Sequence, residues 1–204
     1  MPSSSPTSSP PEKTAGRPRS DSATHAVRDA ALKLAYEGGV QFATVERIAA
    51  RSGVAKTSIY RRWPNAASVV MDAFLAELGP KIRYRSKSSV QETFIDSVRQ
   101  LVLVLKEPQG ELLRNLLGAA QSDQKLQKAF HENWVTPRRS QAMAVIAQAQ
   151  ADGELSGDID SDALLDAIYG SVYFRLMIPY QDLSAAYVEK MVRQVFEGVV
   201  GRGP

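Results

Sequence analysis

The sequence has no cysteine and only two histidines, His25 and His131, among its 204 residues. The missing thiols exclude disulfides, thiol catalysis and thiolate metal sites, and they fit a reducing cytoplasm. Two histidines are too few for a cluster that binds a metal or assists catalysis. From these shortages we expect no metal, no cofactor and a cytoplasmic protein.

Long apolar segments and catalytic motifs are missing as well. No apolar run reaches the roughly 18 residues that a transmembrane helix needs, and the N-terminal MPSSSPTSSPPEK lacks the apolar core of a secretory signal. The sequence has no nucleophile elbow, no glycine-rich phosphate loop and no metal-ligand spacing. We therefore expect neither membrane contact nor enzymatic activity.

The charges are unevenly distributed around a net charge of only +3. Residues 1–87 hold 14 lysines and arginines against 7 acidic residues, whereas residues 88–204 hold 11 against 15. A basic first part predicts polyanion binding that is confined to it. Residues 1–20 are rich in serine and proline and predict a disordered tail, whose Arg17 and Arg19 are candidate DNA contacts. The alternative is a solvated leader without a specific role.

The stretch TVERIAARSGVAKTSIYRRW, residues 44–63, has the pattern of two short helices joined by a tight turn. Ala49 is small enough for the helices to cross closely, and Gly53 can take the positive φ of a sharp turn. Ile59 is the apolar residue of the second helix. The donor-rich side chains around it are candidates for DNA binding: Lys56, Thr57, Ser58, Tyr60, Arg61 and Arg62. This pattern is typical of a helix-turn-helix rather than of an ordinary αα-hairpin in a core.

Apolar residues recur at helical spacing along the rest of the chain, so we predict an all-α fold. The first helix is expected over residues 22–37, and a fourth over 66–78 after the helix-turn-helix. We expect three parts. They are a tail over 1–20, a helix-turn-helix DNA-binding domain over 21–80, and a helical domain for ligand binding and dimerisation over 81–204.

Several short polar positions predict helix ends. Asn65 is expected to cap the fourth helix, because its side chain can accept from an unpaired backbone N–H. Thr136 precedes a proline, which indicates either a kink or a new helix that Thr136 caps. The acidic loop 153–162 lacks the closing glutamate of a calcium loop, so we interpret it as solvated, with Asp160 or Ser161 capping the next helix.

Residues 22–78 resemble the DNA-binding domain of TetR-family transcriptional repressors. The resemblance rests on Phe42, Thr44 and the run IAARSGVAKTSIYRRWPN, followed by a helix. It covers about a quarter of the chain, and the remainder fits the family in length and helical pattern. The resemblance implies a DNA-binding regulator, most simply a repressor of transcription that binds a palindromic operator.

The resemblance also implies roles for single residues. The side chains that would face the major groove are Thr57, Ser58 and Arg61. Thr44 and Tyr60 would contact phosphates, and Lys56 would reach either bases or phosphates. Two positions depart from the family pattern: Ala55 stands where a hydroxyl cap is usual, and Ala66 stands where a lysine is common.

By the same resemblance, the second part binds a small effector between its helices, and binding shifts the fourth helix and releases the DNA. We predict a hydrophobic or aromatic effector. The pocket candidates are aromatic, methionine and amide side chains: Phe94, Gln121, Phe130, Trp134, Met143, Tyr169, Tyr173 and Met177. The alternative is a helix-turn-helix regulator without a small-molecule ligand that a protein partner controls.

The last two predicted helices, over residues 162–177 and from Ser184 onward, carry more apolar residues than one buried face needs. They are therefore candidates for a two-fold, four-helix interface, and the family resemblance favours such a homodimer. The candidates for this interface are Leu165, Val172, Val188, Val192, Val195, Phe196 and Val199. The alternative is that these helices only complete the core of the monomer.

Overall fold

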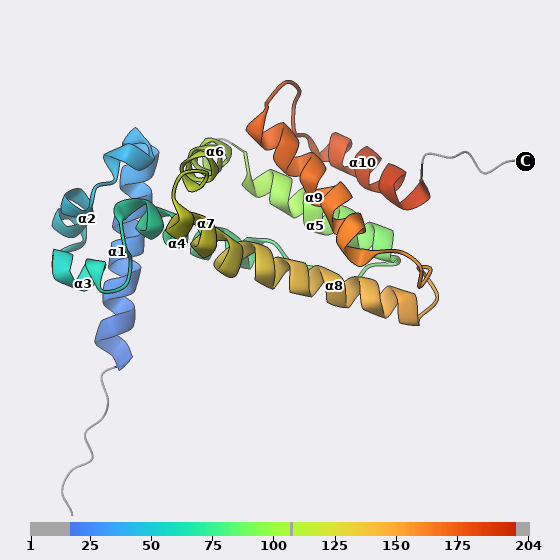
Figure 1. Cartoon of the computed structure of the whole chain (residues 1–204), viewed down its shortest axis with the longest axis horizontal. Helices are drawn as coiled ribbons and strands as arrows, with labels where there is room; N and C mark the ends of the chain where they lie inside the picture. Colours follow the sequence, from blue (N-terminus) through green and yellow to red (C-terminus); the bar gives the residue numbers. More distant parts are fainter. Residues whose placement is uncertain (1–16, 107, 199–204) are drawn as a thin grey trace, which may run out of the picture.

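The computed structural model describes residues 17–106 and 108–198, and every regular element in this part of the chain is helical (Figure 1). The all-α prediction is confirmed. The elements are α1 (Arg17–Gly38), the 3-10 turn η1 (Val40–Phe42), α2 (Val45–Ser52), α3 (Lys56–Tyr60), α4 (Ala66–Leu78), the 3-10 turn η2 (Gly79–Lys81), α5 (Val90–Val104), α6 (Gln109–Ala120), α7 (Gln124–Phe130), the π-helical turn η3 (His131–Val135), α8 (Thr136–Ala151), α9 (Ser161–Met177) and α10 (Ala185–Glu197). Within the described residues, no helix combines the length and the apolar character needed to cross a membrane.

Helices α1 to α4 form an N-terminal unit at one end of the molecule (Figure 1). Helix α1 packs against both α2 and α4, and α2 packs against α3. The core of the unit is made by fully buried side chains such as Val27, Ala31, Ile48 and Ile59. The apolar residues of η1, Val40 and Phe42, pack against this core and are only partly exposed.

Helix α1 begins at Arg17 rather than at the predicted Ser22. Pro18 does not prevent this, because the N–H that proline lacks has no intrahelical partner in a first turn. The predicted tail therefore overlaps a helix at residues 17–20, and residues 1–16 lie outside the described structure. At the other end, the N–H of Gly39 donates to Ala35 O at 2.8 Å with Gly39 at φ 81°, as a C-terminal glycine does.

Helices α5 to α10 form a C-terminal bundle (Figure 1). Helix α10 packs along α5 and touches α9, and α9 in turn packs against α8 and α6. Fully buried side chains from different helices meet in its core, among them Phe94, Leu113, Ile146 and Leu165. One continuous cluster of buried residues runs from the N-terminal unit into this bundle, so the two parts share a core.

The helix does not restart at Thr136. Thr136 has helical dihedrals, φ −58° and ψ −51°, and its side chain caps nothing, so α7, η3 and α8 follow one another without a loop. Of the two alternatives that the Thr136-Pro137 pair left open, the kink is the better description. The π-helical turn ends at Val135, two residues before Pro137, where the hydrogen-bond ladder has to accommodate a residue that has no N–H.

Two caps join the N-terminal unit to the bundle. The Asn65 side chain accepts from Ser68 N at 2.8 Å and so caps α4, as predicted. Its Nδ2 donates at 2.9 Å to Asp123 Oδ2, and Asp123 itself caps α7. The pKa of Asp123 is lowered by the hydrogen bonds that it accepts, first from the backbone N–H of Leu126 and then from Asn65, while desolvation raises it. The start of α4 is thereby held against the start of α7.

Candidate functional site

The stretch predicted as a helix-turn-helix has that geometry in the structure. Thr44 caps α2 by accepting from Arg47 N at 3.3 Å. Gly53 ends α2 in the left-handed region at φ 70°, which a residue with a Cβ rarely adopts. Helix α3 starts at Ala55 without a side-chain cap, as the sequence indicated, and Ile59 is its one fully buried residue.

The outer face of α3 and the turn after it carry most of the predicted DNA-binding side chains. All but Ser58, which is half-buried, are exposed: Lys56, Thr57, Tyr60, Arg61 and Arg62. Tyr60 is among the most exposed large side chains in the described part of the chain, at 52%. A short helix that is anchored through a single apolar side chain and exposes the rest suits insertion into a groove.

One predicted contact already has an acidic neighbour. Lys56 Nζ lies 3.4 Å from Glu46 Oε1, and both side chains are exposed. Hydrogen bonds to the carboxylate, first from the backbone N–H of Glu46 and then from Lys56, lower its pKa. A phosphate at this place has to compete with Glu46 for the lysine.

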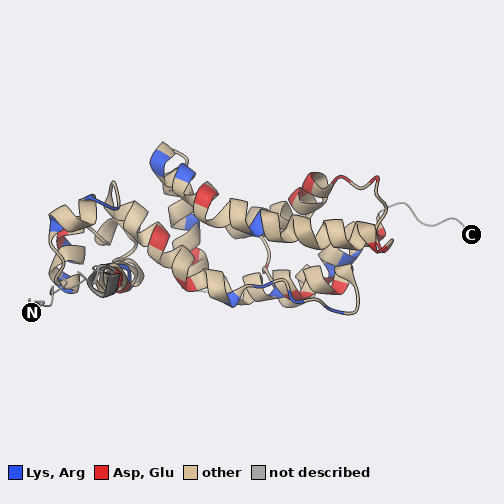
Figure 2. Cartoon of the chain, turned by 90° about the horizontal axis from the view of Figure 1, so that it is seen from below, with Lys and Arg blue, Asp and Glu red and all other residues tan. Residues whose placement is uncertain are grey.

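Sequence reasoning missed Arg47, which stands at the same end of α2 as Thr44. Its guanidinium lies 3.7 Å above the centre of the Phe42 ring and donates to Phe42 O at 3.2 Å. The side chain is exposed, so it extends the basic surface beside the helix-turn-helix. The side chains of Arg17 and Arg19 lie outside the described structure. The ribbon in Figure 2 carries positions of both signs along the described chain, so the basic excess of the first part is a net imbalance among mixed charges.

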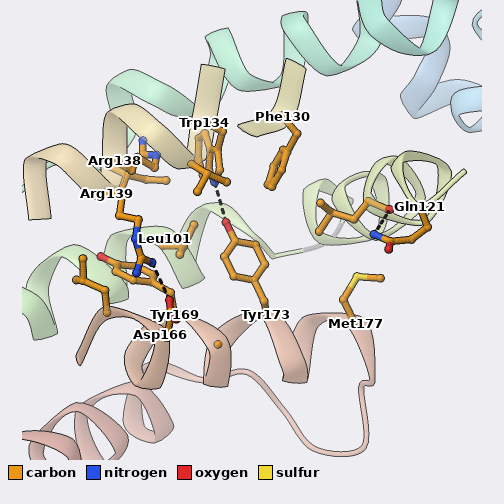
Figure 3. Close-up of a pocket in the computed structure, with 15 residues that line it drawn as sticks. Leu101, Gln121, Phe130, Trp134, Arg138, Arg139, Asp166, Tyr169, Tyr173 and Met177 are labelled. Atoms are coloured by element: carbon orange, nitrogen blue, oxygen red, sulfur yellow. Dashed lines mark hydrogen bonds and ion pairs between the residues drawn. The ribbon is translucent and has the colours of Figure 1, made fainter. Parts of the chain in front are cut away.

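A second site lies in the C-terminal bundle, where a cavity of about 450 Å³ opens between α5, α6, α8 and α9 (Figure 3). Most of its lining is apolar. The lining residues are Ile82, Leu101, Leu117, Gln121, Phe130, Trp134, Val135, Arg138, Arg139, Leu165, Asp166, Tyr169, Gly170, Tyr173 and Met177. A cavity of this size and character is typical of a small-molecule site.

Six of the eight predicted pocket residues line this cavity, and two do not. The six are Gln121, Phe130, Trp134, Tyr169, Tyr173 and Met177. Phe94 is fully buried in the core, where its ring packs 5.6 Å from that of Tyr84 and 5.7 Å from that of Phe196. Met143 packs against the core from α8 without reaching the cavity. The assignment of Phe94 and Met143 to the pocket was wrong, because aromatic and methionine side chains fill cores as readily as they line pockets.

The polar groups of the cavity include tyrosine hydroxyls and two arginines, beside Gln121 and Asp166. Trp134 Nε1 donates to the Tyr173 hydroxyl at 2.7 Å, and burial raises the pKa of Tyr173 to about 12 (Figure 3). The hydroxyls of Tyr84 and Tyr169 hydrogen-bond to each other, and burial raises the pKa of Tyr169 well above its ordinary value. These phenols are therefore neutral at physiological pH and able to donate.

Sequence reasoning missed the two arginines of α8. Arg139 is neutralised by Asp162, at 2.9 Å from its Nε, and by Asp166, at 2.7 Å from its Nη1. The Arg138 guanidinium lies 4.0 Å above the Trp134 ring, and its Nη2 donates to Gly79 O at 3.2 Å. On a helix of mixed polarity, nothing in the local sequence separates such residues from ordinary surface charges.

The predicted dimer-interface residues are mostly inside the monomer. Four of them are fully buried in the bundle: Leu165, Val172, Val188 and Val192. Val195 and Phe196 are half-buried, with Phe196 against Phe94, and Val199 lies outside the described residues. The prediction failed for the buried four because α9 is apolar on two faces, and the sequence does not tell which face packs on its own chain.

The exposed recognition helix and the helical bundle define a DNA-binding regulator of the helix-turn-helix class. Two family models match the chain: "Bacterial regulatory proteins, tetR family" over residues 27–70 and "Tetracyclin repressor-like, C-terminal domain" over residues 87–195. The chain belongs to the TetR family of transcriptional regulators, so it is a DNA-binding protein and not an enzyme.

Individual relatives agree with this assignment. The uncharacterized HTH-type transcriptional regulator YdeS of Bacillus subtilis (strain 168) is 33% identical over 184 residues, which cover 90% of this chain and 93% of YdeS. The crystal structure of the TetR family transcription regulator SCO0332 has a TM-score of 0.76 at 29% identity, covering 88% of this chain and 97% of that one. FadR from Bacillus subtilis, solved in complex with stearoyl-CoA, has a TM-score of 0.68 at 18% identity and covers 86% and 98%.

Proposed function

We propose that this TetR-family regulator is a cytoplasmic, dimeric repressor that binds a palindromic operator and is released by a small organic effector. The observation that carries the proposal is the cavity of about 450 Å³ in the bundle, because its lining includes a residue of the segment that directly follows α4 and η2. Ile82, just after α4 and η2, lines that cavity, so a ligand there touches the connection to the N-terminal unit. The cavity also favours a small molecule over a protein partner as the controlling signal.

On the DNA side, we assign base contacts to the groove-facing side chains of α3 and of the residue that ends it: Thr57, Ser58 and Arg61. Thr44 and Tyr60 contact phosphates from either side of the turn. Lys56 contacts a phosphate of the DNA backbone once its ion pair with Glu46 is broken. Arg62, Arg47 and the two arginines in the first turn of α1, Arg17 and Arg19, add non-specific attraction, which falls with rising salt.

For the dimer interface, we propose the outward face of α9 instead of the four predicted residues that are buried in the monomer. Ala163, Ala167, Gly170 and Phe174 are exposed and follow one another at steps of four, three and four residues, which puts them on one stripe. Small side chains at such steps let two helices approach closely. A groove beside the stripe is lined from α10 by Tyr187 and other residues. A two-fold pairing of α9 and α10 with their copies forms a four-helix interface.

For the effector, the apolar lining fits a hydrophobic or aromatic body of drug-like size. The stearoyl-CoA complex of FadR provides a precedent for an organic ligand in a protein of similar fold. The effector releases DNA only if it binds the DNA-free conformation more tightly, and operator DNA then weakens effector binding by the same factor.

The experiment starts from selection of bound duplexes out of a random pool, using the full-length chain. A palindromic consensus, bound by two chains with steep salt dependence, supports the repressor. A screen of small apolar molecules then measures the melting temperature with and without the selected duplex. If no compound both raises the melting temperature and weakens duplex binding, release by an effector is refuted.

A further inference from the structure

Arg138 is a cation in the cavity wall whose bonded partner among the described residues is a neutral carbonyl. It is half-buried on α8, and among the described residues no carboxylate forms an ion pair with it. The two arginines of the lining face a single acidic residue, Asp166, and this carboxylate is held by Arg139. The lining thus carries one positive charge in excess, and that charge belongs to Arg138.

The surroundings of Arg138 leave its charge incompletely compensated. Burial is the main cause that lowers the pKa of its guanidinium, although arginine remains protonated at any physiological pH. A guanidinium presents five N–H donors, of which one is bonded to Gly79 O. A half-buried cation with unused donors, beside an apolar space, is stabilised by an organic anion that enters the space.

A second donor faces the same space. The Tyr173 hydroxyl accepts from Trp134 Nε1, which leaves its own proton free for an acceptor in the cavity. Trp134 contacts both groups, because its Nε1 donates to the Tyr173 hydroxyl at 2.7 Å and the Arg138 guanidinium lies 4.0 Å from the centre of its ring. One ligand beside Trp134 can therefore reach both. Figure 3 shows both side chains beside Trp134, on opposite walls of the cavity.

Arg138 also touches the end of the helix that carries the DNA-binding unit. Its bond partner Gly79 is the C-terminal cap of α4, where backbone carbonyls have no intrahelical donor. A cation at this end is also favoured by the helix dipole. Arg138 therefore stands between the cavity on one side and the C-terminal end of α4 on the other.

We propose that the effector is an amphipathic organic anion of the carboxylate type, bound through its charge by Arg138 and the Tyr173 hydroxyl with its apolar body along Phe130 and Leu117. Binding turns the guanidinium from the Gly79 carbonyl into the cavity and so detaches the end of α4 from α8. This inference rests on the proposed function, since it specifies which effector acts and how the bundle passes its binding on to α4.

The test compares acids with neutral molecules of the same shape on the full-length protein. The probes are decanoate and 4-phenylbutyrate, each paired with its primary amide. We expect the acids to raise the melting temperature and to weaken binding of the selected operator duplex, and the amides to be about ten- to hundred-fold less effective, the range for one charge-assisted hydrogen bond.

Variants locate the effect. Arg138→Met keeps the apolar stem and should remove the preference for acids, whereas Arg138→Lys keeps the charge without the planar fork and should retain part of it. Hydrogen exchange of the backbone N–H groups within residues 79–83, where Pro80 has none, reports the link to α4. In the wild type, binding of a carboxylic acid probe should speed this exchange. In Arg138→Met the exchange should be fast already, and the same probes should not change it.

The outcomes separate this inference from the proposed function. If the amides bind and release DNA as well as the acids do, or if Arg138→Met, folded by circular dichroism, keeps the preference for acids, the anion assignment is overturned while effector control stands. If acids bind but exchange at residues 79–83 is unchanged, the coupling through Gly79 is overturned. If neither acids nor amides affect melting or DNA binding, effector control itself is refuted, and the inference with it.

Discussion

Trp63 Nε1 donates to Asp72 Oδ2 at 2.9 Å, and this bond fastens the end of the helix-turn-helix to the middle of α4. The same carboxylate accepts from Arg28 of α1, at 2.9 Å from Nε and 3.0 Å from Nη2. Three segments of the N-terminal unit thus meet at one acidic side chain on α4. The junction therefore ties α4 both to α1 and to the residue that follows the helix-turn-helix.

Asp72→Ala removes the shared acceptor, leaving the buried Trp63 Nε1 and Arg28 without it. We expect the free energy of unfolding to fall by about 2 kcal/mol, the usual range for hydrogen bonds to a charged group, and operator affinity to fall with it. Chemical denaturation and duplex titration measure the two effects. Asp29→Ala is the control: it loses only an exposed pair with Lys33, for which about 0.5 kcal/mol or less is expected. Equal losses in both variants would show that the junction at Asp72 has no special role.

Arg61→Ala and Tyr60→Phe should have different signatures. If Arg61 contacts a base edge, its loss reduces discrimination between operator and random duplex by about 1–3 kcal/mol. If the Tyr60 hydroxyl contacts a phosphate, its loss weakens both duplexes nearly equally. Titration of both variants with both duplexes checks this, with Arg51→Ala as the control because Arg51 is paired with Glu37 at 2.6 Å. The reverse pattern would overturn the two role assignments.

Ala55→Ser should stabilise the start of α3. Ala55 has φ −59° and ψ 139°, an extended conformation in which a serine hydroxyl can accept from the N–H groups of the first turn. We expect a gain of about 0.5–1 kcal/mol in unfolding free energy, and a loss of about 1 kcal/mol in Thr44→Ala, which removes an existing cap. Denaturant unfolding of the two variants measures both changes. A loss in Thr44→Ala without a gain in Ala55→Ser would mean that α3 is limited by something other than its cap.

Ala167→Glu should break the proposed dimer without unfolding the chain. Ala167 is exposed in the monomer, so a longer acidic side chain clashes only with a partner helix and faces its own copy across the two-fold axis. Sedimentation should give a dimer for the wild type and a monomer for the variant. Ala147→Glu on the exposed side of α8 is the matched control and should stay dimeric. A dimeric Ala167→Glu would exclude the outward face of α9 from the interface.

The helix-turn-helix is the part of the molecule that sequence predicted best, and the reason is locality. Thr44, Gly53 and Asn65 act on backbone groups a few residues away, so a cap or a left-handed turn can be inferred from neighbouring letters. The same holds for the missing cap at Ala55. Helical periodicity was likewise enough for the all-α fold, because 3.6-residue spacing is a property of each segment by itself.

What only the tertiary structure decided is which side of each helix faces which neighbour. Helix α9 carries apolar residues on two faces, and packing alone buries Leu165 and Val172 and leaves Ala167 exposed. Arg138 has the sequence context of a surface residue, yet the packing of α8 against the end of α4 makes it part of a cavity wall. By itself the sequence determined the helices, their caps and the DNA-binding motif. The assignment of faces depends on contacts between residues distant in the chain, which no local pattern records.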